Sequence, residues 1–142
     1  MRERRVASST RDAQVALSLR TLGGLSTPEV ARALMVPEAT MAKRLTRAKQ
    51  KIQQAHIPYR VPADHELPDR LSSVLTTLYL IFNEGYAATS SPDLMRAHLV
   101  DEALRLTALL HHLMPDEPSV IGLRALELLQ DSRRATRVDD TG

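Results

Sequence analysis

Residues 25–52 read LSTPEVARALMVPEATMAKRLTRAKQKI, and this stretch decides the fold class. Ser26 stands three residues before Glu29, which is the spacing of a capping box, and Pro28 suits a first helical turn. The short helix that follows is expected to end at residues 35–37, because a proline disfavours helical geometry at the residue before it. A second helix then runs from Pro37 to about Gln54, with no residue that breaks it.

The second helix is amphipathic. Its apolar residues recur at intervals of 4, 3 and 4, a single stripe at the helical period, in Met41, Leu45, Ala48 and Ile52. At about 100° per residue, basic and hydroxyl side chains point away from that stripe, with Arg44 on its flank. The sequence therefore predicts a helix that is apolar on one side and cationic on the other.

Two helices joined by a tight turn, the second basic on its outer side, indicate a DNA-binding helix-turn-helix. An α-helix fits the major groove, and its Lys and Arg side chains neutralise phosphates. The alternative is a solvated basic face on an ordinary helical hairpin, which the spacing of the basic residues alone would favour. The complete unit favours DNA binding, through Thr40, Lys43, Arg44, Thr46, Arg47 and Lys51.

Charge is distributed unevenly along the chain. Up to Arg60 there are 12 Lys and Arg residues against 4 Asp and Glu, and the remainder has 7 against 13. This split suggests that only the first part faces a polyanion.

Composition narrows the class of protein further. Of the 142 residues, 43% are apolar but only 3% aromatic, so the core depends on aliphatic side chains that favour an all-α fold. The chain has no Cys, no apolar run of about 20 residues and no secretion signal, so we expect a cytoplasmic protein without a membrane span. No catalytic constellation or cofactor motif stands out, so we expect no enzyme and no cofactor.

The remaining boundaries follow from helix signals. We expect a flexible basic arm over residues 1–11 and a helix-turn-helix domain over 12–56, with Asp12 capping its first helix and Gly23–Gly24 ending it. The apolar stripe of that first helix comprises Val15, Ala16, Leu19 and Leu22. A proline-rich linker is predicted at 57–68, an acidic helical module at 69–136 and a disordered tail at 137–142.

Three helices are expected in the acidic module, as hairpins like the start of a repeat array. The first begins at Leu67 and is expected to stop at Gly85. The second runs from residues 91–93 to about Met114, with an apolar face of Leu99, Ala103, Leu106 and Leu110, widened by Leu109 and Leu113. The third runs from Ser119 to about Arg134, with a row of Ile121, Ala125 and Leu128 flanked by Leu129. An uncovered apolar face here would favour a homodimer.

Residues 12–54 resemble region 4 of bacterial sigma factors of the extracytoplasmic-function (ECF) type. The resemblance rests on Glu29-Val30-Ala31 and on Thr40-Met41, Arg44-Leu45 and Arg47-Ala48-Lys49. It implies that the second helix reads the −35 promoter element and that the domain contacts core RNA polymerase. Met35 departs from the glycine that many helix-turn-helix sequences have at the turn, which suggests a different turn geometry.

Three later segments resemble the subgroup of these sigma factors whose C-terminal extension is related to tetratricopeptide repeats: IPYRVP at 57–62, YLIFNEGYAA at 79–88 and LMPDEPSVIGL at 113–123. The extension is expected to contact polymerase or a regulator protein. Such proteins carry region 2 upstream, and nothing before Asp12 resembles it, so we expect an excised or truncated piece.

Other polar groups support weaker hypotheses. Residues 83–86, Asn-Glu-Gly-Tyr, could bind a ligand, although such groups more often cap or join helices. His111 and His112 are adjacent and so diverge by about 100°, while His98 and Glu102 supply only two ligands, so no metal site is expected.

Three functions remain open at this point. The chain is a promoter-recognition part of a sigma factor, a helical protein-interaction module with an incidental basic helix, or a stand-alone helix-turn-helix regulator of transcription. DNA binding across a salt series separates the second from the others, and RNA polymerase binding separates the first from the third.

Overall fold

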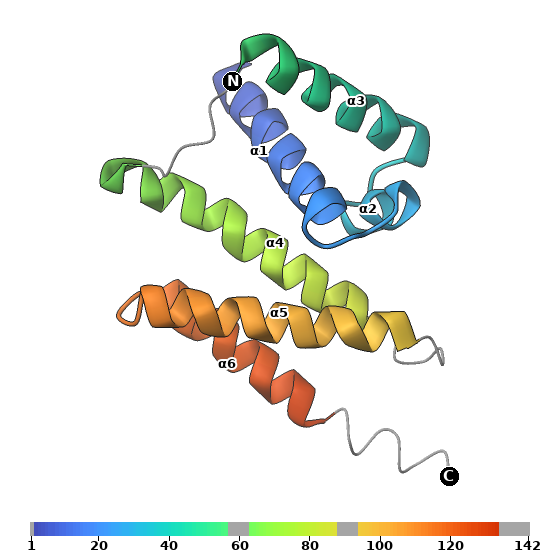
Figure 1. Ribbon diagram of the computed structural model, residues 1–142. Helices are drawn as coiled ribbons and strands as arrows, with labels where there is room; N and C mark the ends of the chain where they lie inside the picture. Colours follow the sequence, from blue (N-terminus) through green and yellow to red (C-terminus); the bar gives the residue numbers. More distant parts are fainter. Residues whose placement is uncertain (1, 57–62, 88–93, 134–142) are drawn as a thin grey trace. The chain divides into compact units, whose positions relative to one another are not determined.

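A computed structural model describes residues 2–56, 63–87 and 94–133, and the side-chain surroundings of 11–56, 63–86 and 97–133. These residues form helices and turns with no strand, which confirms the all-α class (Figure 1). No helix in these ranges is both long and apolar enough to cross a membrane. The chain divides into two compact units, Met1–Leu80 and Ile81–Gly142, whereas the sequence predicts a division at 57–68.

The first helix, α1, spans Arg2–Thr21 and begins ten residues before its expected start. Asp12 therefore lies inside the helix, and the prediction of a flexible arm over 1–11 is wrong for residues 2–11. Arg, Glu and Ala favour helix, and no Gly or Pro interrupts the chain before Gly23, so nothing stops the helix from extending backwards. Its end is as predicted, with Gly24 in the left-handed region at φ +66°.

Helix α2 spans Thr27–Ala33 and begins with the predicted capping box. The backbone N–H of Ser26 donates to the Glu29 carboxylate at 2.7 Å, and the Glu29 N–H donates to the Ser26 hydroxyl at 3.4 Å. Two of the helix-terminal N–H groups thus find partners within four residues of sequence.

The turn after α2 is closed by backbone hydrogen bonds. The Met35 N–H donates to the Arg32 carbonyl at 3.1 Å, and the Val36 N–H donates to the Ala31 carbonyl at 2.9 Å. This pattern is a Schellman motif, in which the residue after the C-cap is left-handed. Met35 takes that position with φ +52°, so the different turn geometry suggested by the sequence is not observed. Its side chain is 92% exposed and gains no packing in return.

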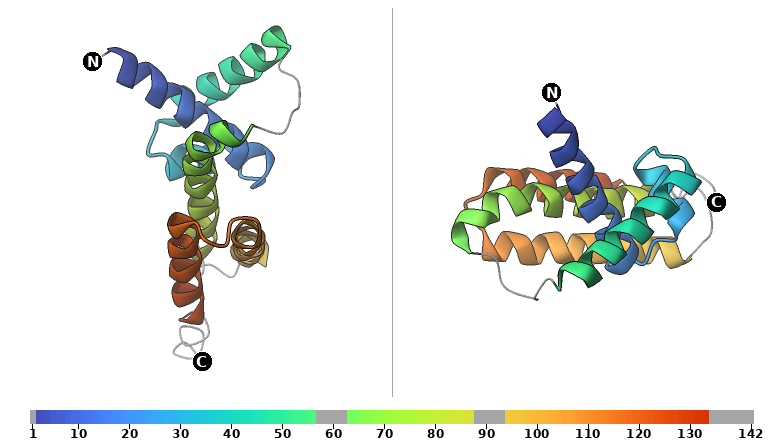
Figure 2. Two further views of the ribbon diagram at one scale, coloured as in Figure 1. Left: turned by 90° about the vertical axis from the view of Figure 1, so that its left-hand side faces the viewer. Right: turned by 90° about the horizontal axis from the view of Figure 1, so that it is seen from above.

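Helix α3 spans Glu38–Ala55 and packs against α1 and α2. Figure 2 shows the three helices from two further directions. Their shared core is aliphatic, as expected, and comprises Val15, Ala16, Leu19, Leu25, Val30, Ala31, Met41 and Leu45. The ends of the predicted stripes are outside this core, since Leu22 is 74% and Ile52 46% exposed.

A short 3₁₀ helix, η1 at Asp64–Glu66, precedes α4 at Leu67–Ala87. The predicted linker at 57–68 therefore ends earlier than expected, while residues 57–62 lie outside the described residues. Pro68 is tolerated because the first helical turn has no intrahelical partner for its missing N–H. The predicted stop at Gly85 is wrong, since α4 continues through it, with Ile81 and Phe82 buried just before it.

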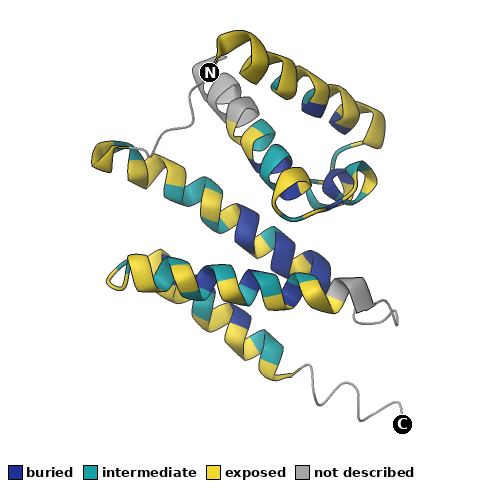
Figure 3. Ribbon diagram, viewed as in Figure 1, coloured by how far each residue is buried: buried dark blue, intermediate teal, exposed yellow. Residues whose placement is uncertain are grey.

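Helices α5, at Leu94–Leu113, and α6, at Pro118–Ser132, pack side by side as a hairpin. The turn between them lies at Pro115 and Pro118. In α5 the predicted face is correct in part, because Ala103 is buried and Leu99, Leu106 and Leu110 are half-buried, while Val100 and Thr107 are also buried. In α6 the buried positions are Val120, Leu123 and Glu127. The predicted row of Ile121, Ala125 and Leu128 faces outward instead, as do Leu109 and Leu113, and Figure 3 shows how little of α6 is buried. The tail at 137–142 lies outside the described residues.

Candidate nucleic-acid interface

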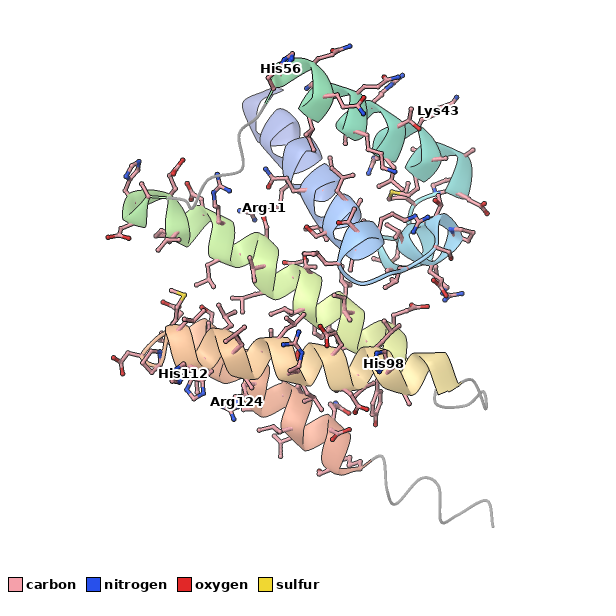
Figure 4. The ribbon with its side chains drawn as sticks, viewed as in Figure 1. Arg11, Lys43, His56, His98, His112 and Arg124 are labelled. Carbon is pink, nitrogen blue, oxygen red and sulfur yellow. The ribbon has the colours of Figure 1, made fainter. Side chains whose placement is uncertain are left out.

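The outer face of α3 presents the residues predicted to bind DNA. Met41 is fully buried and Leu45 is 6% exposed, which fixes the rotation of the helix about its own axis. Thr40, Lys43 and Arg47 are consequently exposed. In Figure 4 the Lys43 side chain points away from α1, on the free side of the helix. Spacings of 3 and 4 place the three side chains in one row along about two turns.

The other three predicted residues lie around this row. Lys51 is exposed one turn beyond Arg47, while Arg44 is only partly exposed on the flank nearer the core. Thr46 is exposed at the opposite edge, and its hydroxyl donates to the Ala42 carbonyl at 3.0 Å. That bond occupies the hydroxyl hydrogen, so Thr46 can accept a hydrogen bond from a base amino group but cannot donate one to a phosphate.

One side chain of this face was missed by the sequence reasoning. Gln50 is exposed and lies seven residues after Lys43, which places it about 20° from Lys43 around the helix. An amide can hydrogen-bond both phosphates and base edges. The spacing of seven from Lys43 was the available signal, but the predicted set comprises only basic and hydroxyl side chains and so omits an amide. By contrast, Lys49 is exposed about 120° away from Lys43, outside the row.

The first turn of α3 combines opposing electrostatic effects. Pro37 is the N-cap and provides no side-chain hydrogen bond, so N–H groups of the first turn are left for other partners. Glu38 stabilises this positive end of the helix dipole but repels an approaching phosphate. Phosphate contacts are therefore favoured from Lys43 onward, where the exposed side chains are cationic.

The remaining candidate sites have structural roles. Residues 83–86 lie inside α4, where Glu84 is buried and the Tyr86 ring stacks on Phe82 with centroids 5.8 Å apart. The Arg124 guanidinium donates to Nδ1 of His111, and Figure 4 shows Arg124 near the α5–α6 turn with His112. Among the described residues, no group of three His, Asp or Glu side chains could hold a metal ion.

Comparison with known proteins agrees with this geometry. Residues 10–52 match sigma-70 region 4, which includes α2, the turn and the predicted DNA-binding residues up to Lys51. Residues 70–142 match a family of unknown function, DUF6596, over half of the chain. The chain belongs to this family.

The chain is also similar to an uncharacterized protein of Rhizobium meliloti (strain 1021). It is 48% identical to the chain over 129 residues, which cover 91% of this chain and 30% of the relative. The chain thus spans about a third of the length of the curated relative that it matches. No solved structure matches the chain.

The region 4 match in the first unit and the DUF6596 match together support a member of the sigma-70 family. Region 4 is a helix-turn-helix domain of transcription factors that bind DNA in promoter recognition and is not an enzyme domain. The region 4 match and the exposed cationic face of α3 fall on the same residues.

Proposed function

We propose that this chain is the −35-reading part of an ECF-type sigma factor, in which α3 enters the major groove of promoter DNA. The observation that carries the proposal is the orientation of α3: Met41 and Leu45 face the core, while Thr40, Lys43 and Arg47 face solvent. A helix held this way can direct some side chains of its exposed face to base edges and other cationic side chains of that face to phosphates.

The six predicted residues take different parts in this proposal. Thr40 and Arg47 contact base edges, the latter suited to a guanine by its two parallel donors. Lys43 and Lys51 neutralise phosphates, and Arg44 neutralises a phosphate from the flank of the helix. Thr46 accepts a hydrogen bond from a base amino group at the edge of the contact.

Binding of fluorescent promoter duplexes to the whole chain tests the proposal. We expect a preference for one −35 sequence and a loss of about 10- to 100-fold in affinity on Arg47→Ala, largely confined to that sequence. Equal binding to all duplexes, unaffected by Arg47→Ala, would instead favour the helical interaction module.

Partners other than DNA form the second part of the proposal. The region 4 part contacts core RNA polymerase, and the α4–α6 part, which resembles the tetratricopeptide-like extension, contacts polymerase or a regulator protein in the cytoplasm. Pull-down of core polymerase by the chain is the expected result. DNA binding without any polymerase binding would favour the stand-alone regulator.

A further inference from the structure

The buried side of α6 is mixed in character, because polar and charged groups lie there together with the buried Val120 and Leu123. Its side toward α5 carries the charged groups: Glu127 is fully buried and accepts a hydrogen bond from the Thr107 hydroxyl at 3.1 Å, and Arg124 donates to His111. Asp131 is one turn beyond Glu127 and partly buried. Every charged side chain between Pro118 and Ser132 therefore lies on or beside the α5 contact.

The outward side of α6 is apolar. Ile121 is 44%, Leu128 51% and Leu129 68% exposed. With Gly122 and Ala125, both exposed, they fall within an arc of about 120° and cover about two turns. Single exposed leucines are common on protein surfaces, but a continuous stripe without any charge is typical of an interaction surface. We call these five residues the α6 stripe.

The order of large and small residues in the α6 stripe shows what can cover it. When a second α6 packs antiparallel about a two-fold axis at Ala125, its residues run in the reverse order along the first α6. The partner's Leu128 then lies over Gly122, and the partner's Leu129 lies beside Ile121. A Cβ built on Gly122 meets nothing within 4 Å, so there is room for a leucine there. Since the stripe carries no charge, two identical copies meet without repulsion, as an isologous contact requires.

We propose that the α6 stripe is a homodimer interface, in which two copies of this chain pair α6 with α6 about a two-fold axis at Ala125. A contact one helix wide lies at the small end of specific interfaces, so the dimer is weak and forms at high micromolar concentration. The occupant is a second copy because, in that register, Leu128 fits over Gly122, Ala125 meets Ala125 and no charge enters the contact.

Sedimentation equilibrium of the whole chain up to several hundred micromolar tests the proposal. The wild-type mass is expected to rise from 15.8 kDa towards twice that value with concentration. Ala125→Glu and Ala125→Lys each bring like charges together at the axis, so each weakens dimerisation by at least about 100-fold. An equimolar mixture of the two variants pairs opposite charges and restores the dimer.

Two further variants keep the test decisive. Gly122→Leu improves helix propensity and adds apolar surface, yet it fills the space needed by the partner's Leu128, so dimerisation falls. Ser119→Glu adds the same charge as Ala125→Glu at an exposed position outside the stripe and leaves dimerisation unchanged. A wild type that stays at 15.8 kDa throughout, or an Ala125→Glu variant that dimerises like wild type, overturns the proposal. Stronger association of Gly122→Leu would also overturn it, because it would indicate nonspecific adhesion.

Discussion

Helices α3 and α6 both carry apolar and charged residues, but they expose different kinds of side chain to solvent. In α3 the apolar stripe faces the core and the cations face solvent. In α6 the charged groups lie on the buried side with Val120 and Leu123, and the α6 stripe faces outward. An exposed cationic face attracts a polyanion through long-range electrostatics, while an exposed apolar face attracts another protein surface through loss of hydration. Amphipathicity alone therefore does not identify the function of a helix; the side that it buries does.

The largest expected effect comes from truncating an apolar side chain in each helix. Met41→Ala removes a fully buried side chain and should lower the free energy of unfolding by about 2–5 kcal/mol. Leu128→Ala removes a side chain that is 51% exposed, so its effect on monomer stability should be within about 0.5 kcal/mol. Urea denaturation at low protein concentration, followed by circular dichroism, measures both. Equal losses of unfolding free energy in the two variants would contradict the burial of Met41 and the exposure of Leu128.

The polar interior of the α5–α6 hairpin predicts a pH dependence. Burial raises the pKa of Glu127 from 4.5 to about 7, an effect partly offset by the hydrogen bond from Thr107. Because the folded state holds a proton that the unfolded chain releases, this group's contribution to stability is complete below pH 4.5 and declines as pH rises, until it levels off above about 7.

Glu127→Gln removes this titration and retains a side-chain oxygen for Thr107. It should stabilise the protein relative to wild type by at most about 3 kcal/mol at pH 8 and change little at pH 4. Urea denaturation of both proteins at the two pH values measures the difference. A difference that does not vary with pH would show that Glu127 titrates alike in the folded and unfolded states.

Some of this comparison was predictable from the sequence. The capping box at Ser26 and the orientation of α3 depend on residues close in sequence, and a strict helical period identifies the buried stripe. In α6 the period fits two rows, Val120–Leu123–Glu127 and Ile121–Ala125–Leu128. Hydrophobicity favoured the second row, because the first contains the charged Glu127. The hydrogen bond from Thr107 that allows Glu127 to be buried joins residues twenty apart on different helices, so the sequence pattern did not reveal it.

Helix ends were less predictable for a related reason. Gly85 is a suitable stop residue, but it is buried within α4, where packing of its neighbours outweighs the roughly 1 kcal/mol that a helical glycine costs. The start of α1 at Arg2 lacks any periodic signal. On α3, Gln50 is exposed on the same side as Lys43, but a set chosen from basic and hydroxyl side chains does not include an amide.

A small gain in stability is expected from a change in the turn before α3. Met35 has φ +52° and an almost fully exposed side chain, so Met35→Gly relieves backbone strain without losing packing. We expect a gain of about 0.5–1 kcal/mol, since the relief of about 1–2 kcal/mol is partly offset by the greater freedom of glycine in the unfolded chain. Thermal denaturation measures it. Gly24→Ala is the control: at φ +66°, with open space around the added Cβ, it should destabilise by a similar amount.

The most direct test of the central claim compares two lysines of α3. Lys43 and Lys49 are both exposed, have the same charge and differ in the side of the helix that they occupy. The account predicts that Lys43→Ala weakens binding of a −35 duplex and lowers the slope of log affinity against log salt by about 1, whereas Lys49→Ala leaves the slope unchanged. Equal changes in both variants would mean that the helix attracts DNA by net charge alone, which would contradict a specific DNA-binding face on α3.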